Sequence, residues 1–175
     1  MKRVMIIGFS GAGKSTLASD IADIIGVEPT YMDKLNWLPG WIEDTRENKR
    51  KKLSKIFERE SWVIDGSYRA VLYKERMKLA DTIIFLDFNR LLCFYRAIKR
   101  RVMYNGKTRP DMTEGCYEKM DFEFAKWVLI DGRKKRKKFY DELEQAIESG
   151  KKIYVFHRPS QVKKFLEELS KGMIQ

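Results

Sequence analysis

The chain is poor in cysteine and histidine, and this scarcity restricts the chemistry that can be expected of it. Its two cysteines, Cys93 and Cys116, form no close metal-ligand pair, and His157 is the only histidine. No zinc module is therefore expected, and no partner for His157 can be named from the sequence. We expect both cysteines to stay as thiols in a reducing compartment, which makes the cytoplasm the expected location.

Long apolar runs are also missing. Near the N-terminus only Val4 to Ile7 are continuously apolar, too few for the core of a secretory signal peptide, and no run reaches the length of a membrane span. The sequence has no linker rich in glycine, serine or proline, no low-complexity tract and no internal repeat. We therefore expect a single domain over residues 1–175, with no membrane as a partner.

Charge, in contrast, is abundant and unevenly placed. The formal net charge is +11, and residues 88–175 carry 21 basic against 12 acidic side chains. A positive field attracts nucleotides, phosphorylated molecules and nucleic acids alike, so charge alone selects no partner among them. The densest basic run, residues 133–138, is equally typical of a solvated helix face.

The most specific motif follows the first apolar run directly. Residues 8–16 read Gly-Phe-Ser-Gly-Ala-Gly-Lys-Ser-Thr and match the phosphate-binding pattern G-x-x-x-x-G-K-[ST] at every fixed position. In such a loop backbone N–H groups face one anion, Lys14 reaches the β- and γ-phosphates, and the Ser15 hydroxyl completes the coordination of Mg²⁺. The sequence thus predicts a bound nucleotide with Mg²⁺. The predicted binding residues are Gly8, Ser10, Gly11, Ala12, Gly13, Lys14, Ser15 and Thr16.

Hydrophobic periodicity alternates between strand and helix along the chain. Strands are predicted at about residues 2–7, 27–32, 62–64, 82–86 and 153–156, and helical patterns at about residues 14–25, 45–60, 70–79, 90–104, 121–148 and near the C-terminus. Thr45 is expected to cap its helix, and Pro29 indicates an edge position or an irregular start for its strand. This alternation is typical of a three-layer α/β fold around a doubly wound parallel five-stranded sheet.

Carboxylates are predicted where ligands bind in such a sheet, beyond the carboxyl ends of the strands. Asp33, Asp65 and Asp87 all fall at such ends. Phosphoryl transfer needs a carboxylate that organises Mg²⁺, and Asp65, beside the flexible Gly66, is our choice for that role. Asp87 is either a competing choice or a cap of the next helix. The turn-forming region at about residues 105–121 is predicted to be a short lid that excludes water.

Two segments carry a resemblance to a known superfamily. The segment 64–69, Ile-Asp-Gly-Ser-Tyr-Arg, resembles the D-G-x-x-R segment of adenylate kinases and nucleoside monophosphate kinases. Residues 86–89 with Arg96, Arg100 and Arg101 are similar to the helix with which that superfamily delivers arginines to its lid. The resemblance covers most of the chain and implies the P-loop nucleoside triphosphate hydrolase/kinase fold with ATP as phosphate donor.

The same resemblance implies roles for several arginines. Arg69 would hold the phosphate of the acceptor, and Arg100 would contact the donor phosphates beside Lys14. Arg109, Arg133 and Arg136 are further candidates from the lid region. Arginine suits these roles because its planar fork grips a phosphate with two parallel donors.

The chain departs from adenylate kinase in the parts that would read AMP. Asn36 stands in place of an acceptor-binding arginine, or that arginine is absent, and no glutamine follows Arg69. An acceptor other than AMP is therefore indicated. Residues 32–41, 66–68 and 109–112, with Gly115 and Cys116, are instead similar to the subgroup called DNA topology modulation proteins, or FlaR-like proteins.

Residues of the expected acceptor-binding region, about 33–60, suit a nucleoside-like molecule. Asp33 accepts hydrogen bonds from a hydroxyl or a base edge, while Trp37, Trp41 and Tyr68 offer flat faces for stacking. Gly66, Arg69, Arg109, Arg133 and Arg136 complete the predicted acceptor site. Packing of both tryptophans against the core stays open as an alternative.

These residues predict an ATP-dependent, Mg²⁺-requiring small-molecule kinase with a nucleotide or nucleoside acceptor. Lys14, Asp65, Arg69 and Arg100 would carry the chemistry. The alternative is an ATP-binding regulator of DNA topology without small-molecule turnover, for which non-specific nucleic-acid binding through the basic half would suffice. The sequence leaves open the acceptor, the choice between ATP and GTP, and the oligomeric state.

Overall fold

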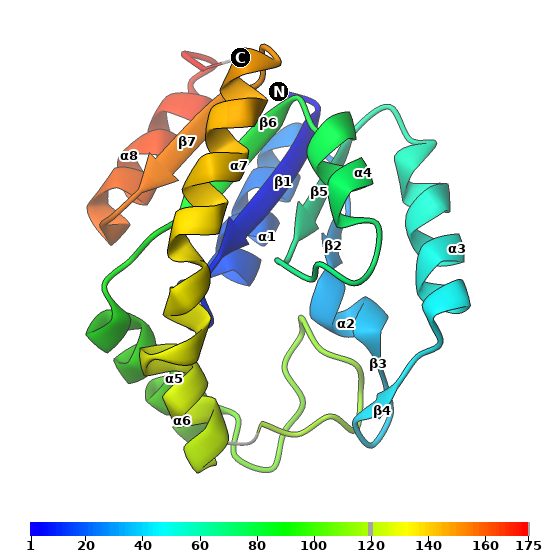
Figure 1. The fold of residues 1–175 in the computed structure, drawn as a ribbon, viewed down its shortest axis with the longest axis vertical. Helices are drawn as coiled ribbons and strands as arrows, with labels where there is room; N and C mark the ends of the chain where they lie inside the picture. The colour runs from blue at the N-terminus through cyan, green and yellow to red at the C-terminus, as the bar shows by residue number, and fades with distance from the viewer. Residues whose placement is uncertain (119–120, 175) are drawn as a thin grey trace.

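One parallel sheet forms the centre of the molecule (Figure 1). The computed structural model describes residues 1–118 and 121–174. The strands follow the order β2-β5-β1-β6-β7, and each neighbouring pair is parallel. They span Arg3–Gly8 (β1), Pro29–Tyr31 (β2), Trp62–Asp65 (β5), Thr82–Leu86 (β6) and Lys152–Phe156 (β7). The predicted five-stranded parallel sheet is confirmed.

Helices connect the strands and cover both faces of the sheet (Figure 1). They span Lys14–Ile25 (α1), Met32–Asn36 (α2), Arg46–Phe57 (α3), Tyr73–Leu79 (α4), Arg90–Met103 (α5), Phe122–Leu129 (α6), Arg136–Glu148 (α7) and Pro159–Ser170 (α8). A 3-10 helix, η1 (Asp131–Lys135), joins α6 to α7, so the helical pattern predicted at about residues 121–148 is interrupted there. The strands therefore have helical layers on either side.

Alternation along β1 explains why the layers form on both faces. Val4 and Ile6 belong to the apolar cluster that includes α1 and α8, whereas Met5 and Ile7 belong to the cluster that includes α3 and α7. All four side chains are fully buried. A strand buried on both faces has a continuous apolar run rather than an alternating one, which is the pattern read in the sequence.

Local signals determined several boundaries. Helix α1 has the predicted range, Thr45 caps α3 by accepting a hydrogen bond from the Asn48 N–H, and β2 with Pro29 lies at the sheet edge. Asp33, however, lies in the first turn of α2 rather than at the end of a strand.

Two very short strands, β3 (Trp37–Leu38) and β4 (Ile42–Glu43), form an antiparallel hairpin that was not predicted. The predicted lid packs against this hairpin (Figure 1). Thr113 donates to the Trp37 carbonyl at 2.6 Å, and Trp41 Nε1 donates to the Tyr117 carbonyl at 3.1 Å. Residues 119 and 120 of the predicted lid lie outside the described residues.

The fold also bears on the expected absence of a membrane span and on the expected free thiols. Within the described part of the chain, no helix combines the length and the apolar character needed to cross a membrane. Cys93 and Cys116 are both buried and free.

Candidate active site

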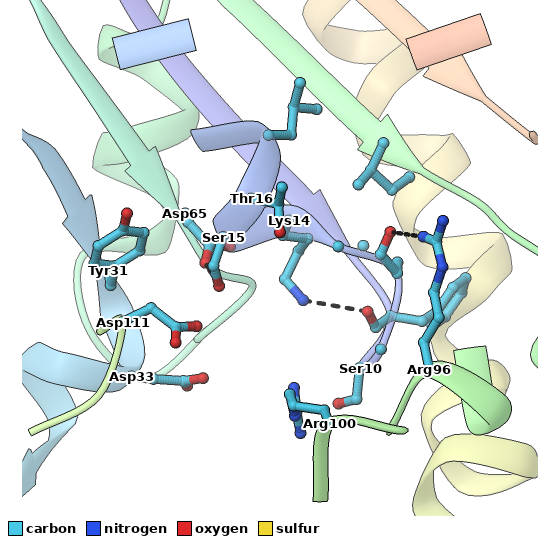
Figure 2. A pocket seen from close by; sticks show the side chains of 18 of the residues that line it. Ser10, Lys14, Ser15, Thr16, Tyr31, Asp33, Asp65, Arg96, Arg100 and Asp111 are labelled. Atoms are coloured by element: carbon cyan, nitrogen blue, oxygen red, sulfur yellow. Dashed lines mark hydrogen bonds between the residues drawn. The ribbon is translucent and has the colours of Figure 1, made fainter. Parts of the chain in front are cut away.

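The phosphate loop lies between β1 and α1 and is held by close contact with α5 (Figure 2). Gly11 has a φ of 77°, and a Cβ there would lie 2.2 Å from the carbonyl oxygen of Cys93. Only glycine fits, because the backbone is left-handed and the α5 backbone leaves no room. Arg96 of α5 donates from Nη1 to the Ala12 carbonyl at 3.1 Å. Helix α5 therefore fixes one side of the loop.

The segment after β5 fixes the start of the loop. The Ser67 hydroxyl accepts a hydrogen bond from the Gly8 N–H at 3.1 Å and donates to the Gly8 carbonyl at 3.2 Å. Lys14 donates from Nζ to the Phe9 carbonyl at 3.2 Å, so its ammonium group lies across the loop (Figure 2). The loop leads into the N-terminus of α1, whose unpaired N–H groups and dipole favour an anion.

Ser15 and Asp65 form a polar pair beside this loop (Figure 2). Ser15 Oγ donates to Asp65 Oδ2 at 2.7 Å, whereas Oδ1 of the same carboxyl is buried and has no hydrogen-bond partner in the described structure. Burial raises the pKa of Asp65 to about 6, against the opposing effects of the Lys14 charge and the Ser15 hydrogen bond. Asp65 Oδ1 is therefore available to accept a further hydrogen bond.

This pair fits Mg²⁺ better than a metal that needs many protein ligands. Mg²⁺ keeps several waters and takes few carboxylates together with substrate phosphates. Among residues 1–118 and 121–174, no group of three or more His, Cys, Asp or Glu side chains is arranged to hold a metal ion. A Mg²⁺ ion here would accordingly depend on Ser15, on Asp65 through its waters, and on phosphate oxygens.

A single cleft joins the loop to the predicted acceptor residues. Its volume is about 1420 Å³, above the roughly 300–1,000 Å³ of a pocket for one small ligand, so two substrates have room. The loop residues that line it are Gly8, Ser10, Gly11, Ala12, Gly13, Lys14, Ser15 and Thr16. The predicted acceptor residues that line it are Asp33, Trp37, Trp41, Gly66, Tyr68, Arg69 and Arg109.

The acceptor end has aromatic walls. The rings of Trp37 and Trp41 meet edge to face with centroids 5.4 Å apart. Burial and the charge of Asp33 raise the pKa of Tyr68, whose hydroxyl therefore stays protonated. The tryptophans thus contact one another and also border the cleft.

Arg69 borders the cleft but is already bound to a carboxylate. Its Nη1 and Nη2 donate to the two carboxylate oxygens of Glu142 on α7, the second at 2.8 Å. Its guanidinium lies 4.6 Å from the ring centroid of Tyr73 and 5.1 Å from that of Phe139. The hydrogen bonds with Glu142 raise the pKa of Arg69.

Arg100 and Arg109 share a second carboxylate. Their Nε atoms lie 3.1 Å and 2.6 Å from Glu118 Oε1, respectively. Arg109 Nη1 also lies 3.3 Å from Asp111, and its Nη2 lies 4.0 Å from Asp33. Burial first, and then the charge of Arg109, lower the pKa of Arg100.

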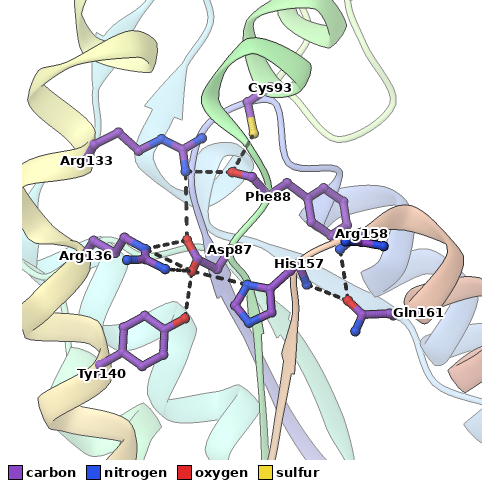
Figure 3. Close-up of polar contacts among 9 residues, drawn as sticks. All are labelled: Asp87, Phe88, Cys93, Arg133, Arg136, Tyr140, His157, Arg158 and Gln161. Carbon is purple, nitrogen blue, oxygen red and sulfur yellow. Dashed lines mark hydrogen bonds and ion pairs between the residues drawn. The ribbon is translucent and has the colours of Figure 1, made fainter.

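Arg136 lies outside the cleft lining, in a network around Asp87 (Figure 3). Arg136 Nη2 and the Tyr140 hydroxyl both donate to Asp87 Oδ2 at 2.7 Å, and His157 Nδ1 lies 3.4 Å from it. Asn89, not Asp87, caps α5, so the capping hypothesis for Asp87 is wrong. Asn89 sits directly before the helix, where its side chain accepts from a first-turn N–H, while Asp87 is engaged by α7.

Arg133 also lies outside the cleft lining and supports the phosphate loop from behind. Its Nη1 donates to the Phe88 carbonyl at 2.7 Å (Figure 3), and its guanidinium carbon lies 3.8 Å from the centroid of the Phe9 ring. The structure therefore brings Lys14, Asp65 and Arg100 to one cleft but places Arg133 beneath it.

Solved structures of other proteins share the architecture of this chain. No family model and no curated protein matches the chain. A shikimate kinase from Bacteroides thetaiotaomicron is 22% identical, with 98% of each chain covered and a TM-score of 0.57. A shikimate kinase from Acinetobacter baumannii in complex with shikimate is 18% identical, with 100% of this chain and 96% of the other covered and a TM-score of 0.60. The chain has a P-loop kinase fold.

A deoxyadenosine kinase from M. mycoides with bound dATP has the same fold, with 16% identity, 97% of this chain and 98% of the other covered, and a TM-score of 0.52. At such identities the likeness concerns the fold, and function has to be argued from the site. The predicted P-loop kinase architecture is confirmed, whereas similarity to the FlaR-like subgroup stays a prediction.

Arg76 supports the site of this P-loop kinase fold but was not predicted. It is fully buried on α4 and donates to the Gly66 carbonyl at 2.6 Å and to the Tyr68 carbonyl. Burial lowers the pKa of Arg76 to about 10, so it is still charged at neutral pH. Arg76 fixes the segment between Asp65 and Arg69, but nothing local in the sequence separates it from the other arginines.

Proposed function

We propose that the chain is an ATP-dependent, Mg²⁺-requiring phosphotransferase that acts on a nucleotide- or nucleoside-like small molecule. The observation that carries the proposal is the continuity of one cleft from the phosphate loop to an aromatic-walled second end. A nucleotide switch needs only the first end. A kinase needs both, because catalysis of phosphoryl transfer is mainly the positioning of donor and acceptor.

Each group at the phosphate end has a role in this proposal. Lys14 would leave the Phe9 carbonyl and bind the β- and γ-phosphates, which also face the loop N–H groups. Ser15 and Asp65 would hold Mg²⁺, the latter through water, and the bound ion would neutralise charge on the phosphates. Arg100, at the end of α5, would stabilise negative charge on the phosphoryl group as it transfers.

The acceptor end would orient a hydroxyl group toward the donor. The acceptor oxygen forms a bond to the γ-phosphorus while the bond to the β–γ bridging oxygen breaks, which leaves ADP, and the hydroxyl proton passes to Asp33. Trp37, Trp41 and Tyr68 would stack on the acceptor ring. Two structurally similar proteins are named as kinases of small molecules, shikimate and deoxyadenosine, which supports a small-molecule acceptor.

Two arginines of the predicted acceptor site are engaged elsewhere in the described structure. Arg133 and Arg136 would reach a ligand only by leaving Phe88 and Asp87. The buried cysteine thiols are compatible with a reducing compartment such as the cytoplasm. A regulator of DNA topology related to the FlaR-like subgroup is the second candidate, since the basic half would attract nucleic acid.

The test is transfer of label from γ-labelled ATP with Mg²⁺ to nucleosides, nucleotides and small hydroxylated metabolites. Lys14→Ala should lower turnover by about 10²–10³-fold, as expected for the loss of a charge-stabilising donor. The control is Lys137→Ala, whose side chain is 89% exposed, and it should retain activity. An active Lys14→Ala variant would contradict the proposal, and ATP binding without transfer would favour the regulator.

A further inference from the structure

We propose that the acceptor enters the cleft without a phosphate group of its own. It is an unphosphorylated, hydroxylated molecule with a flat ring, such as a nucleoside, rather than a nucleoside monophosphate. This inference rests on the proposed kinase function and narrows it. It also departs from the role of Arg69 that the resemblance to nucleoside monophosphate kinases implies.

The first reason is that Glu142 already occupies the paired Nη donors with which Arg69 would grip a phosphate. Both terminal nitrogens are bound by Glu142, and the Tyr73 hydroxyl donates to the same carboxylate at 2.8 Å. The Arg69 Nε atom is buried, out of reach of a ligand. A phosphate that displaced Glu142 would leave that carboxylate, 21% exposed, without its counter-charge. Loss of one partner of such a pair is costly, so the exchange is unfavourable.

The second reason is that Arg109 is surrounded by carboxylates. Its three nitrogens face Glu118, Asp111 and Asp33 at 2.6, 3.3 and 4.0 Å, and its side chain is only 9% exposed. Arg100 shares Glu118 with it. Three carboxylates thus surround two guanidinium groups, so in the described part of the chain these two arginines bring no excess positive charge to a second anion.

The third reason is that Asp33 is more exposed than Arg69, Arg109 or Asp111, the other charged groups of the acceptor end. The Asp33 side chain is 45% exposed, and it lies with Asp111 and Asp65 along the wall opposite Lys14 and Arg100 (Figure 2). A phosphate near these carboxylates would be repelled, and repulsion between single charges close to a protein surface weakens binding by about tenfold or more. A hydroxyl, in contrast, donates a hydrogen bond to Asp33.

The aromatic walls of the cleft indicate that the acceptor contains a flat ring. Trp37 and Tyr68 both line the cleft, beside Asp33. Aromatic faces bind any flat ring and carry no charge, so they hold a nucleobase or a similar ring without selecting for a phosphate. Charge and shape at this end therefore agree on a neutral ring with hydroxyl groups.

Paired acceptors test the inference. Each nucleoside and its own 5′-monophosphate, for example adenosine with AMP and cytidine with CMP, are compared as acceptors with ATP and Mg²⁺, with Lys14→Ala as control. We expect kcat/KM for at least one nucleoside to exceed that for its monophosphate by about tenfold or more. Lys14-dependent transfer that prefers a monophosphate would overturn the inference and leave the kinase assignment intact. Absence of transfer to both classes would overturn both.

Glu142→Gln tests the cause of the discrimination. This variant frees Arg69 from a negative partner, so the preference for the nucleoside over its monophosphate should fall by about tenfold while KM for ATP stays unchanged. Glu144→Gln, at an exposed position of the same helix, is the control and should keep the preference. Should Glu142→Gln fail to fold, Asp111→Asn removes a carboxylate that faces Arg109 in the cleft and should reduce the preference likewise. An unchanged preference in a folded variant would contradict the charge argument.

Discussion

Asp65→Asn should stabilise the protein while it abolishes most of the activity. The folded-state pKa of Asp65 is about 6, raised from 3.8 by burial. Below pH 3.8 the carboxyl is protonated in both the folded and the unfolded chain. Between that value and about 6 the unfolded chain releases the proton and the folded chain keeps it, so stability falls as the pH rises through this window.

The size of this effect follows from the shift. One pKa unit corresponds to about 1.36 kcal/mol, so a shift of about two units costs about 3 kcal/mol above pH 6. Asp65→Asn cannot ionise and still accepts the Ser15 hydrogen bond through its amide oxygen. Its free energy of unfolding should therefore exceed that of the unmodified protein by up to about 3 kcal/mol at pH 8, and by about half of that at pH 5.

Urea unfolding at both pH values, with EDTA and without nucleotide, measures the difference. Asp141→Asn, whose side chain is 51% exposed, is the control and should change the free energy of unfolding by no more than about 0.5 kcal/mol. Asp65→Asn should at the same time lose Mg²⁺-dependent transfer. Our reasoning is refuted if the variant is no more stable than the unmodified protein at pH 8, or if its gain does not depend on pH.

Three further substitutions test other parts of the fold. Gly11→Ala and Gly26→Ala both place a side chain at positive φ, which costs about 1–2 kcal/mol. Only the Cβ at position 11 would meet backbone, so thermal unfolding should show a loss of stability about 1–3 kcal/mol larger for Gly11→Ala than for Gly26→Ala. Equal losses would argue against the contact with α5. Arg76→Lys should lose about 1.5–3 kcal/mol in urea unfolding because one ammonium cannot serve both carbonyls, and an unchanged midpoint would count against this role. Thr45→Ala removes the cap of α3 and should lower the free energy of unfolding by about 1 kcal/mol in urea. An unchanged free energy of unfolding would show that the cap does not stabilise the helix.

Local signals explain what could be predicted from the sequence. The phosphate loop and α1 are encoded by consecutive residues, since the motif begins the helix and Gly26 ends it. The strand Thr82–Leu86 is a buried apolar run between polar turns, which requires no knowledge of its neighbours. Ser15 and Asp65 could be assigned to one site because a parallel sheet brings the ends of its strands to one edge.

Long-range pairing explains what could not be predicted. Glu142 lies 73 positions from Arg69, and no local pattern distinguishes it from the other acidic residues of its helix. The hairpin strand Trp37–Leu38 has 2 residues, too few for a periodicity to show. Asp87 and Asn89 both follow the same strand, and the sequence does not reveal that α7 engages the first while the second caps a helix.

The two ends of the cleft differ in how they are built, and this has a consequence for protein engineering. The phosphate end belongs to the sheet and to α1 and α5, whereas the hairpin and the loop before α6 contribute Trp37, Trp41 and Arg109 to the acceptor end. Two hydrogen bonds join these segments, one from Thr113 to the Trp37 carbonyl and one from Trp41 to the Tyr117 carbonyl, and each joins residues 76 positions apart in the sequence. Grafting either segment alone onto a related scaffold would break these bonds. The two segments therefore have to be exchanged together if their contribution to the acceptor end is to be transferred intact.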